Sequence, residues 1–316
     1  MNDGITVYRG RRFDNYNRRQ IQKVLVLDLD DTLGSFSHLH ILWTGILKCN
    51  KGNIDKACVF TRLFSLYPEF LRDNIREVLK EMNAHKQKDT KIFLYTNNQC
   101  QTPGWVDSVV QYIEDISETP ELFDQFVRAF KIKNCVVEPK RTSMSKSLDD
   151  LINCTSITKP VEICFIDDRY YPNMIHDNVY YIHPVAYYHS LPIKNIIDRY
   201  IKSSLGIEMR AQSTVSKNYK EFITDWFEFN NAGRYVHNSY TPSSMRDVTT
   251  KLIFHINKFF ASKVETQELI KITTPRTPKK NTQKKNPRIS STKKSRSANI
   301  RSPSTRSAPD PSTFEK

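Results

Sequence analysis

The feature that most restricts the fold of this chain is a series of short apolar segments that end in polar residues. Residues 23–30 (KVLVLDLD), 91–98 (KIFLYTNN) and 161–168 (VEICFIDD) each have the length of a β-strand. They are nearly continuous in apolar residues, which is typical of strands buried on both faces. Amphipathic helical patterns separate them, at residues 68–82 and 104–116. Strands that alternate with helices predict βαβ units and a mainly parallel sheet.

The polar ends of these segments indicate where a functional site would lie. In a parallel α/β sheet, ligands bind at the carboxyl ends of the strands. Six polar side chains follow the three apolar segments, namely Asp28, Asp30, Thr96, Asn97, Asp167 and Asp168. The sequence therefore predicts a site at which several carboxylates converge with a hydroxyl and an amide.

Further patterns complete the expected α/β domain. Residues 178–184 (NVYYIHP) predict a fourth strand, and residues 143–152 (SMSKSLDDLI) predict a helix that opens on serine caps. Residues 191–262 carry further helical patterns to which no function can be assigned. We expect them to form a helical extension that either packs on the sheet or makes an accessory bundle.

The segment Asp28-Leu29-Asp30-Asp31-Thr32 has the pattern DxDxT directly after the first apolar run. Alone, this pattern has little specificity, because roughly one chain in twenty of this length would contain it by chance. A strand-end turn with solvated acids is the alternative explanation. The matching polar ends of the later strands favour a functional site.

In these motifs the chain resembles the haloacid dehalogenase superfamily of phosphotransferases. Four motifs occur in the order of that superfamily: VLVLDLDDTLG, FLYTNN, Lys146 in SKSLDDL, and FIDDRYYPN. The similarity extends further to the branch of RNA polymerase II C-terminal-domain phosphatases (small C-terminal-domain phosphatase and NLI-interacting-factor type). It covers residues 20–195. The resemblance implies a Rossmann-like, mainly parallel sheet flanked by helices.

The resemblance also implies a role for each motif residue. Asp28 would be the nucleophile that forms an aspartyl-phosphate, and Asp30 would protonate the leaving oxygen and then activate water. Thr96 and Lys146 would bind phosphoryl oxygens. Asp28, the backbone carbonyl of Asp30, and Asp168 would ligate Mg²⁺. The supporting positions are Thr32, Asn97 and Asp167.

The chain departs from the pattern of that branch at several positions. Asp31 stands where Glu is commoner, and Arg169 stands where a small residue is usual. These differences bear on the substrate and leave the chemistry in place. Lys140 is a second candidate for the lysine of the third motif. Lys146 is preferred because it opens a predicted helix and precedes Leu148 at the matching spacing.

The spacing of the motifs bears on the substrate. About 60 residues separate the first and second motifs, and about 50 separate the second and third. In this superfamily a large inserted cap usually marks enzymes for small metabolites, so short inserts imply an open site. The resemblance favours a Mg²⁺-dependent phosphatase of phosphoserine or phosphothreonine in a protein. The alternatives are a nucleotide or polynucleotide-end phosphatase, and a silent binding module, against which the filled catalytic positions argue.

The positive charge of the chain is concentrated at one end. The formal net charge is +14, and residues 271–316 hold 13 of the 48 basic and 2 of the 34 acidic residues. This segment therefore carries +11, and the first 270 residues carry +3. Since it has almost no apolar residues, we expect a disordered basic tail. It resembles a nuclear-localisation or nucleic-acid-binding segment, so we expect a nucleic-acid or acidic partner there, with a solubilising tail as the alternative.

Several classes of protein are not expected. The first 20 residues contain no apolar run, so no signal peptide is predicted. No stretch approaches 18 apolar residues, so neither a transmembrane helix nor a membrane partner is expected. The six cysteines include no CxxC pair, which argues against zinc and disulfides and favours a reducing compartment. We expect an intracellular protein of the nucleus or cytoplasm, with four parts: residues 1–19, an N-terminal extension; 20–195, the phosphatase domain; 196–270, the helical extension; and 271–316, the tail.

Overall fold

The apolar segments pair into one six-stranded sheet. A computed structural model of the chain describes residues 4–14, 22–50, 54–87, 89–99, 102, 104–157, 160–235 and 242–261. The strands, in the order β1-β8-β7-β2-β3-β4, are β1 (Ile5–Arg9), β8 (Val179–Pro184), β7 (Val161–Ile166), β2 (Gln22–Leu27), β3 (Thr90–Tyr95) and β4 (Gln125–Val127). All neighbours are parallel except β1 and β8. The predicted α/β fold with a mainly parallel, Rossmann-like sheet is confirmed, whereas the tail predicted at 271–316 lies outside the described residues.

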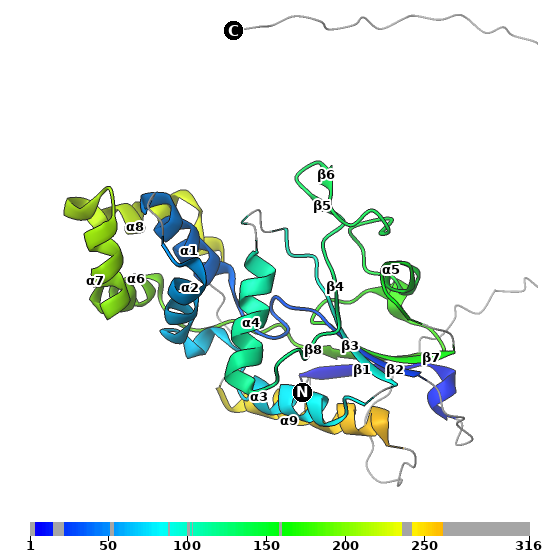
Figure 1. Ribbon diagram of the computed structural model, residues 1–316. Helices are drawn as coiled ribbons and strands as arrows, with labels where there is room; N and C mark the ends of the chain where they lie inside the picture. Colours follow the sequence, from blue (N-terminus) through cyan, green and yellow to red (C-terminus); the bar gives the residue numbers. More distant parts are fainter. Residues whose placement is uncertain are drawn as a thin grey trace, which may run out of the picture. The chain divides into compact units, whose positions relative to one another are not determined.

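Helices cover both faces of the sheet (Figure 1). Alternate side chains of β2, such as Leu25 and Leu27, belong to one hydrophobic cluster with α3 (Ile75–Ala84), α4 (Trp105–Ser117) and α9 (Pro242–Phe260). The other set, Val24 and Val26, packs in a second cluster with α5 (Leu148–Cys154). The central strands are therefore buried on both sides, as their continuous apolar runs indicate.

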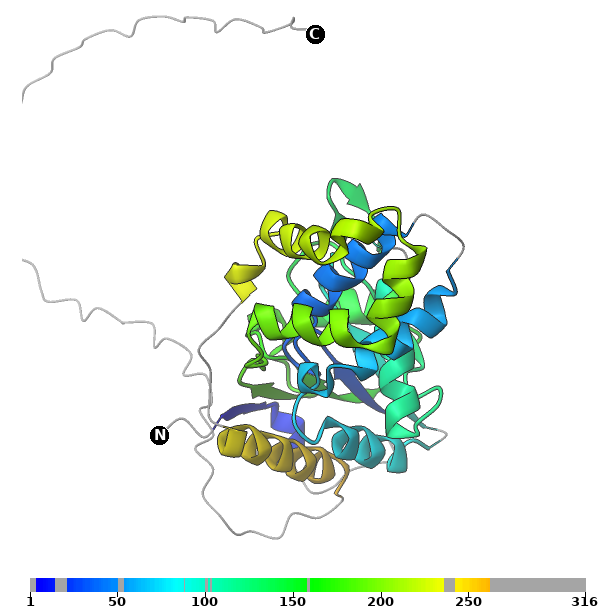
Figure 2. The same cartoon turned by 90° about the vertical axis from the view of Figure 1, so that its left-hand side faces the viewer.

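A further group of helices packs beside the sheet, at the left in Figure 1, and Figure 2 views the molecule from that side. It consists of α1 (Ser37–Cys49), α2 (Lys56–Ser65), α6 (Ile193–Lys202), α7 (Ser204–Gln212) and α8 (Tyr219–Phe229). Helix α8 contacts α1 and α6, and α7 contacts α2. Tyr200 and Phe227 belong to the same hydrophobic cluster as Leu25 of the central strand. The helices expected as an extension at 196–270 thus share a core with the sheet.

Short elements connect these helices and strands. They are the hairpin β5 (Lys131–Ile132) and β6 (Cys135–Val136), and the 3₁₀ turns η1 (Arg11–Asp14), η2 (Pro68–Phe70), η3 (Pro172–Met174), η4 (Ser216–Asn218) and η5 (Ala232–Tyr235). None of the helices in the described ranges is both long and apolar enough to cross a membrane.

The N-terminal segment takes part in the sheet. Residues 1–19 were expected as an extension outside the domain, but Ile5–Arg9 forms the edge strand β1, antiparallel to β8. Gly10 follows at a close approach, because a Cβ there would lie 2.2 Å from the carbonyl oxygen of His176. Only glycine fits this contact without a shift of the backbone.

Two predicted helix starts were wrong. The pattern at 68–82 begins as the turn η2, and α3 starts only at Ile75, because Asn74 before it has a left-handed φ of 55°. The pattern at 143–152 yields a helix only from Leu148, where the hydroxyl of Ser147 accepts a hydrogen bond from the backbone N–H of Asp150. Residues 143–147 form a loop instead.

Candidate active site

The strand order brings the predicted site together. Strand β2 lies between β3 and β7, with Leu27 opposite both Leu94 and Ile166. The chain leaves β2 for β3 on one side and returns through β7 on the other, which makes the carboxyl end of β2 a topological switch point. The polar residues that follow these three strands therefore meet at one edge of the sheet.

Lys146 lies at the centre of this group. Its ammonium donates to Asp28 Oδ1 at 2.5 Å and to Asp167 Oδ2 at 2.6 Å, and its side chain is fully buried. Burial acts to lower the pKa of Lys146, but the charges of Asp167 and Asp28 outweigh it and raise the pKa. Lys140, the alternative lysine, is exposed. The geometry thus favours Lys146 for the third motif.

Three carboxylates form a cluster that could hold a metal ion. Asp28, Asp167 and Asp168 each offer an oxygen, and these oxygens lie within 4.8 Å of one another. Both oxygens of Asp167 accept hydrogen bonds, one from Lys146 and one from the backbone N–H of Arg169. Asp28 and Asp168 each keep one oxygen that accepts no hydrogen bond from the described residues. Hard oxygen donors of this kind suit a cation such as Mg²⁺.

Thr32 orients Asp168. Its hydroxyl donates to Asp168 Oδ1 at 2.8 Å and accepts from the backbone N–H of Asp168 at 3.0 Å. Burial, followed by the charge of Asp28, raises the pKa of Asp168 to about 6. A nearby cation would relieve this repulsion between carboxylates.

Asp30 has the environment of an acid-base group. Its Oδ2 accepts a hydrogen bond of 2.7 Å from the side-chain amide of Asn98. Burial, together with the charge of Asp28, raises the pKa of Asp30 to about 7. A carboxyl group with a pKa near neutrality can both give and take a proton at physiological pH.

The loop after β2 holds Asp31 in a strained conformation. Asp31 has a φ of 61°, which costs a residue with a Cβ about 1 kcal/mol or more. The loop is held by the buried guanidinium of Arg72, which donates to the carbonyl oxygens of Asp31 and Thr32 at 2.8 and 2.6 Å. Sequence reasoning missed Arg72, because an arginine in an amphipathic pattern is normally assigned to the solvent-exposed face.

The residues after β3 form a second supporting network. The hydroxyl of Thr96 is buried and accepts from the backbone N–H of Asn98. Asn97 accepts from Arg141 at 2.8 Å and donates to the hydroxyl of Tyr171 at 3.0 Å. Asn97 thereby positions the loop that leads to Lys146. Arg141 and Tyr171 were also missed as supporting residues, although Tyr171 belongs to the fourth motif and Arg141 lies five residues before Lys146.

These side chains enclose a cavity of about 110 Å³, named here the acidic cavity. It is lined by Asp28, Asp30, Asp31, Thr96, Asn97, Asn98, Asp167, Arg169 and Tyr171. Lys146 reaches it through Asp28 and Asp167, and Arg169 adds a second cation at its wall. Acids balanced by buried and exposed cations suit a small anion that is accompanied by a metal ion.

All eight predicted site residues lie at this edge. Five take part in hydrogen bonds with another of the eight: Lys146 bonds to Asp28 and Asp167, and Thr32 bonds to Asp168. Asp30, Thr96 and Asn97 line the acidic cavity. No family model matches the chain, and searches of curated proteins and of solved structures found no match either. What the chain does is therefore inferred from its own residues.

Proposed function

We propose that the chain is a Mg²⁺-dependent phosphomonoester hydrolase of the haloacid dehalogenase type, acting through an aspartyl-phosphate on Asp28. One observation carries the proposal. The carboxylate of Asp28, hydrogen-bonded to the buried Lys146, lines the same small cavity as Asp30, whose pKa of about 7 suits an acid and a base in turn. Phosphoryl transfer by way of a covalent enzyme intermediate requires a nucleophile and a group that carries a proton. Both lie here beside one space of the size of an anion.

The two half-reactions use these carboxyl groups in sequence. An oxygen of Asp28 attacks phosphorus, the bond from phosphorus to the leaving oxygen breaks, and protonated Asp30 gives its proton to that oxygen. Asp30 then takes a proton from water, which attacks the phosphorus of the aspartyl-phosphate. The bond from phosphorus to Asp28 breaks, phosphate leaves, and both carboxyl groups return to their starting states.

The cation would be held by oxygen atoms that are not used in hydrogen bonds within the site. Asp28 and Asp168 have an oxygen free of hydrogen bonds from the described residues, and the backbone carbonyl of Asp30 is the third expected ligand. Bound Mg²⁺ offsets the repulsion between the carboxylates and the dianionic phosphate. Asp167, although part of the carboxylate cluster, is committed to Lys146 and the backbone of Arg169. We assign it to holding Lys146 in place.

The acidic cavity holds the phosphoryl group, so the substrate class depends on the surface beyond Asp30. The sequence resemblance implies phosphoserine or phosphothreonine of a protein. The alternative is a nucleotide or polynucleotide end, for which basic residues at 271–316 would add affinity for nucleic acid.

One panel of assays tests the chemistry. Hydrolysis of an aryl phosphate, a phosphoserine-proline peptide and a 3′-phosphorylated oligonucleotide is measured with and without Mg²⁺, for the wild type, Asp28→Asn and the matched control Asp115→Asn. Asp115 is an exposed acid on α4. We expect Mg²⁺-dependent turnover that Asp28→Asn abolishes and the control retains. A wild type that turns over none of the three with Mg²⁺ present would overturn the proposal in favour of a silent binding module.

A further inference from the structure

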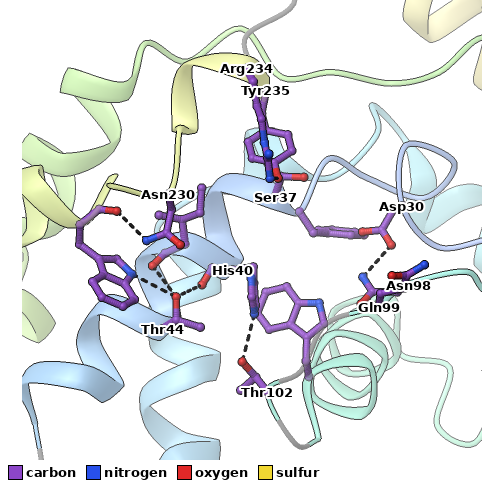
Figure 3. Close-up of a pocket in the computed structure, with 14 residues that line it drawn as sticks. Asp30, Ser37, His40, Thr44, Asn98, Gln99, Thr102, Asn230, Arg234 and Tyr235 are labelled. Atoms are coloured by element: carbon purple, nitrogen blue, oxygen red, sulfur yellow. Dashed lines mark hydrogen bonds between the residues drawn. The ribbon is translucent and has the colours of Figure 1, made fainter. Parts of the chain in front are cut away.

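A second and larger cavity continues from the acidic cavity. It has a volume of about 720 Å³ and is named here the side cavity. The two cavities share Asp30 and Asn98 in their linings. In Figure 3 these two residues lie at one side of the side cavity, and Thr44 and Asn230 lie at the other. Asp30 thus stands between a small charged space and a large one.

The position of Asp30 assigns a direction to the substrate. In the proposed reaction Asp30 protonates the leaving oxygen, so the group attached to that oxygen must lie on the side of Asp30 away from phosphorus. The side cavity opens there. Its volume is within the range of about 300–1,000 Å³ that is usual for small-molecule sites. The leaving group therefore has a preformed space.

The walls of the side cavity are mostly uncharged. The first turns of α1 supply His40, whose pKa burial lowers to about 4, so the imidazole is neutral at pH 7. Amide groups come from Asn98, Gln99 and Asn230. Among the described lining residues, the only cationic side chain is that of Arg234. A polynucleotide, which needs a series of cations along its phosphates, is disfavoured.

The aromatic residues of the lining are held in fixed positions. The indole N–H of Trp226 donates to Thr44 at 3.2 Å, and the ring of Trp105 packs edge-on against His40 with centroids 4.8 Å apart. Trp105 is only 2 % exposed. Aromatic rings held in this way can pack against a planar ligand without a large loss of conformational freedom.

The origin of the lining disfavours a peptide. Its residues come from the loop after β2, the first turns of α1, the loop before α4 and the start of that helix, the end of α8 and the turn η5, and no described strand contributes to it. Extended peptides are usually bound along a sheet edge or in an elongated groove, because their backbone continues on both sides of the modified residue. A compact cavity with aromatic walls and amide groups suits one planar ring system with hydrogen-bonding edges.

We propose that the side cavity binds the nucleoside of a nucleoside monophosphate. This inference rests on the proposed phosphatase function, because that function places the leaving group beside Asp30. It assigns substrate specificity to helices α1 and α8 and the turn η5, including residues 226–235.

The experiment uses the full chain with Mg²⁺ and two kinds of substrate. The first kind is the four ribonucleoside monophosphates in their 5′ and 3′ forms, and the second is acetyl phosphate, whose leaving group is only acetate. A phosphoserine-proline peptide is the competitor. We expect the highest kcat/KM among the esters for a nucleoside monophosphate. A peptide with a higher kcat/KM than every nucleotide would overturn the nucleoside assignment and leave the phosphatase function standing.

Two variants test the cavity itself. Ser37→Trp places an indole in the lining at the first residue of α1, and Ser65→Trp makes the same change at an exposed position of α2. We expect Ser37→Trp to raise the KM for the preferred nucleotide at least about tenfold, with kcat/KM for acetyl phosphate within about twofold of the wild type. Ser65→Trp should change neither. An equal loss for both substrates in Ser37→Trp would mean that the change acts on the chemistry, and would overturn the assignment.

The second variant shortens an aromatic wall of the cavity. Trp226→Phe should weaken nucleoside binding about fivefold, because the smaller ring offers less surface for a base to stack on. Trp43→Phe, at a buried tryptophan of α1 outside the lining, is its control. Binding of adenosine, guanosine, cytidine and uridine is measured by calorimetry, independently of turnover. Binding without turnover of any substrate would overturn the phosphatase function alone, whereas acetyl phosphate turnover without any nucleoside binding would overturn the side-cavity assignment alone.

Discussion

The acidic cavity and the side cavity meet at Asp30 but are built in different ways. The acidic cavity measures about 110 Å³ and is formed by residues that follow strands β2, β3 and β7, many of them charged and hydrogen-bonded to one another. The side cavity measures about 720 Å³ and is formed by helix ends and loops with mostly neutral side chains. In the proposed function, the residues that follow the strands would supply the chemistry, whereas the helices α1 and α8 and the turn η5 would determine what that chemistry acts on.

The largest expected effect is on turnover, and it should leave the affinity of the side cavity for its ligand unchanged. Asp28→Asn should lower kcat about 10⁴-fold or more for every substrate, because an amide cannot form the aspartyl-phosphate. Adenosine affinity should stay within about twofold of the wild-type value, because Asp28 does not line the side cavity. Steady-state kinetics and calorimetry on the same preparation measure both quantities.

The matched control for this prediction is Asp115→Asn on α4, which should leave both turnover and affinity unchanged. A loss of adenosine affinity that parallels the loss of turnover in Asp28→Asn would show that the two cavities act as one site. The division between chemistry and specificity would then fail.

The second prediction concerns the buried charges of the acidic cavity. Lys146→Met should lower the free energy of unfolding by about 3–5 kcal/mol, because it leaves Asp28 and Asp167 buried without their cation. Urea unfolding measures the change. Lys80→Met is the control, since Lys80 pairs with Glu118 at 2.9 Å on the surface, where water screens the two charges and the loss of the pair should have little effect. Equal effects of the two changes would mean that Lys146 does not compensate buried charge.

The third prediction tests the cation without using activity. Mg²⁺ at about 100 times its Kd should stabilise the wild type by about 2.7 kcal/mol and raise its Tm accordingly. Asp168→Asn should remove most of this shift, because it takes a charged oxygen from the carboxylate cluster while an amide oxygen can still accept from Thr32. Asp115→Asn should keep the full shift. A full shift in Asp168→Asn as well would place the bound cation elsewhere.

The sequence predicted the acidic cavity better than the side cavity for a physical reason. Strand β2 and the acids after it can be recognised from a short stretch of sequence, since a strand buried on both faces is apolar throughout and polar residues follow its carboxyl end. The resemblance added Lys146, although three nearby serines suggested a helix that begins too early. Strand β1 was missed because its partner β8 lies about 170 residues away. The buried Arg72 and Arg141 were missed because charged residues normally face solvent.

The side cavity has no local signal. Its walls combine the first turns of α1, the loop before α4 and residues 226–235, and no periodicity in the sequence links these segments. The short spacing between the motifs predicted an open site. In the structure, helix α8 and the turn η5 contact α1 and supply part of the wall of the side cavity. Which segments pack together is a property of the fold, so the prediction could not include it.

The last prediction concerns how the wall of the side cavity is held, and its effect per pH unit is small. The backbone N–H of Leu191 donates to His189 Nδ1 at 3.2 Å, so His189 must carry its proton on Nε2 and donate to His38 Nδ1 at 2.8 Å. His38 then donates from Nε2 to the carbonyl oxygen of Ala232 in η5 at 3.0 Å. This relay requires a neutral His189, and burial, followed by the charge of His38, lowers the pKa of His189 to about 3.

Acid should therefore lower the free energy of unfolding, because His189 must stay neutral in the folded chain. His189 has a lower pKa in the folded chain than the value of 6.5 expected for the unfolded chain, so its contribution to stability is present above pH 6.5 and is lost as the pH falls from there towards 3. In this range His189 should cost the wild type up to about 1.4 kcal/mol per pH unit. His189→Gln, which keeps a donor but cannot titrate, should reduce the slope of unfolding free energy against pH by that amount. His176→Gln, at an exposed histidine, should keep the wild-type slope, and an unchanged slope in His189→Gln would mean that the relay does not hold η5 in place.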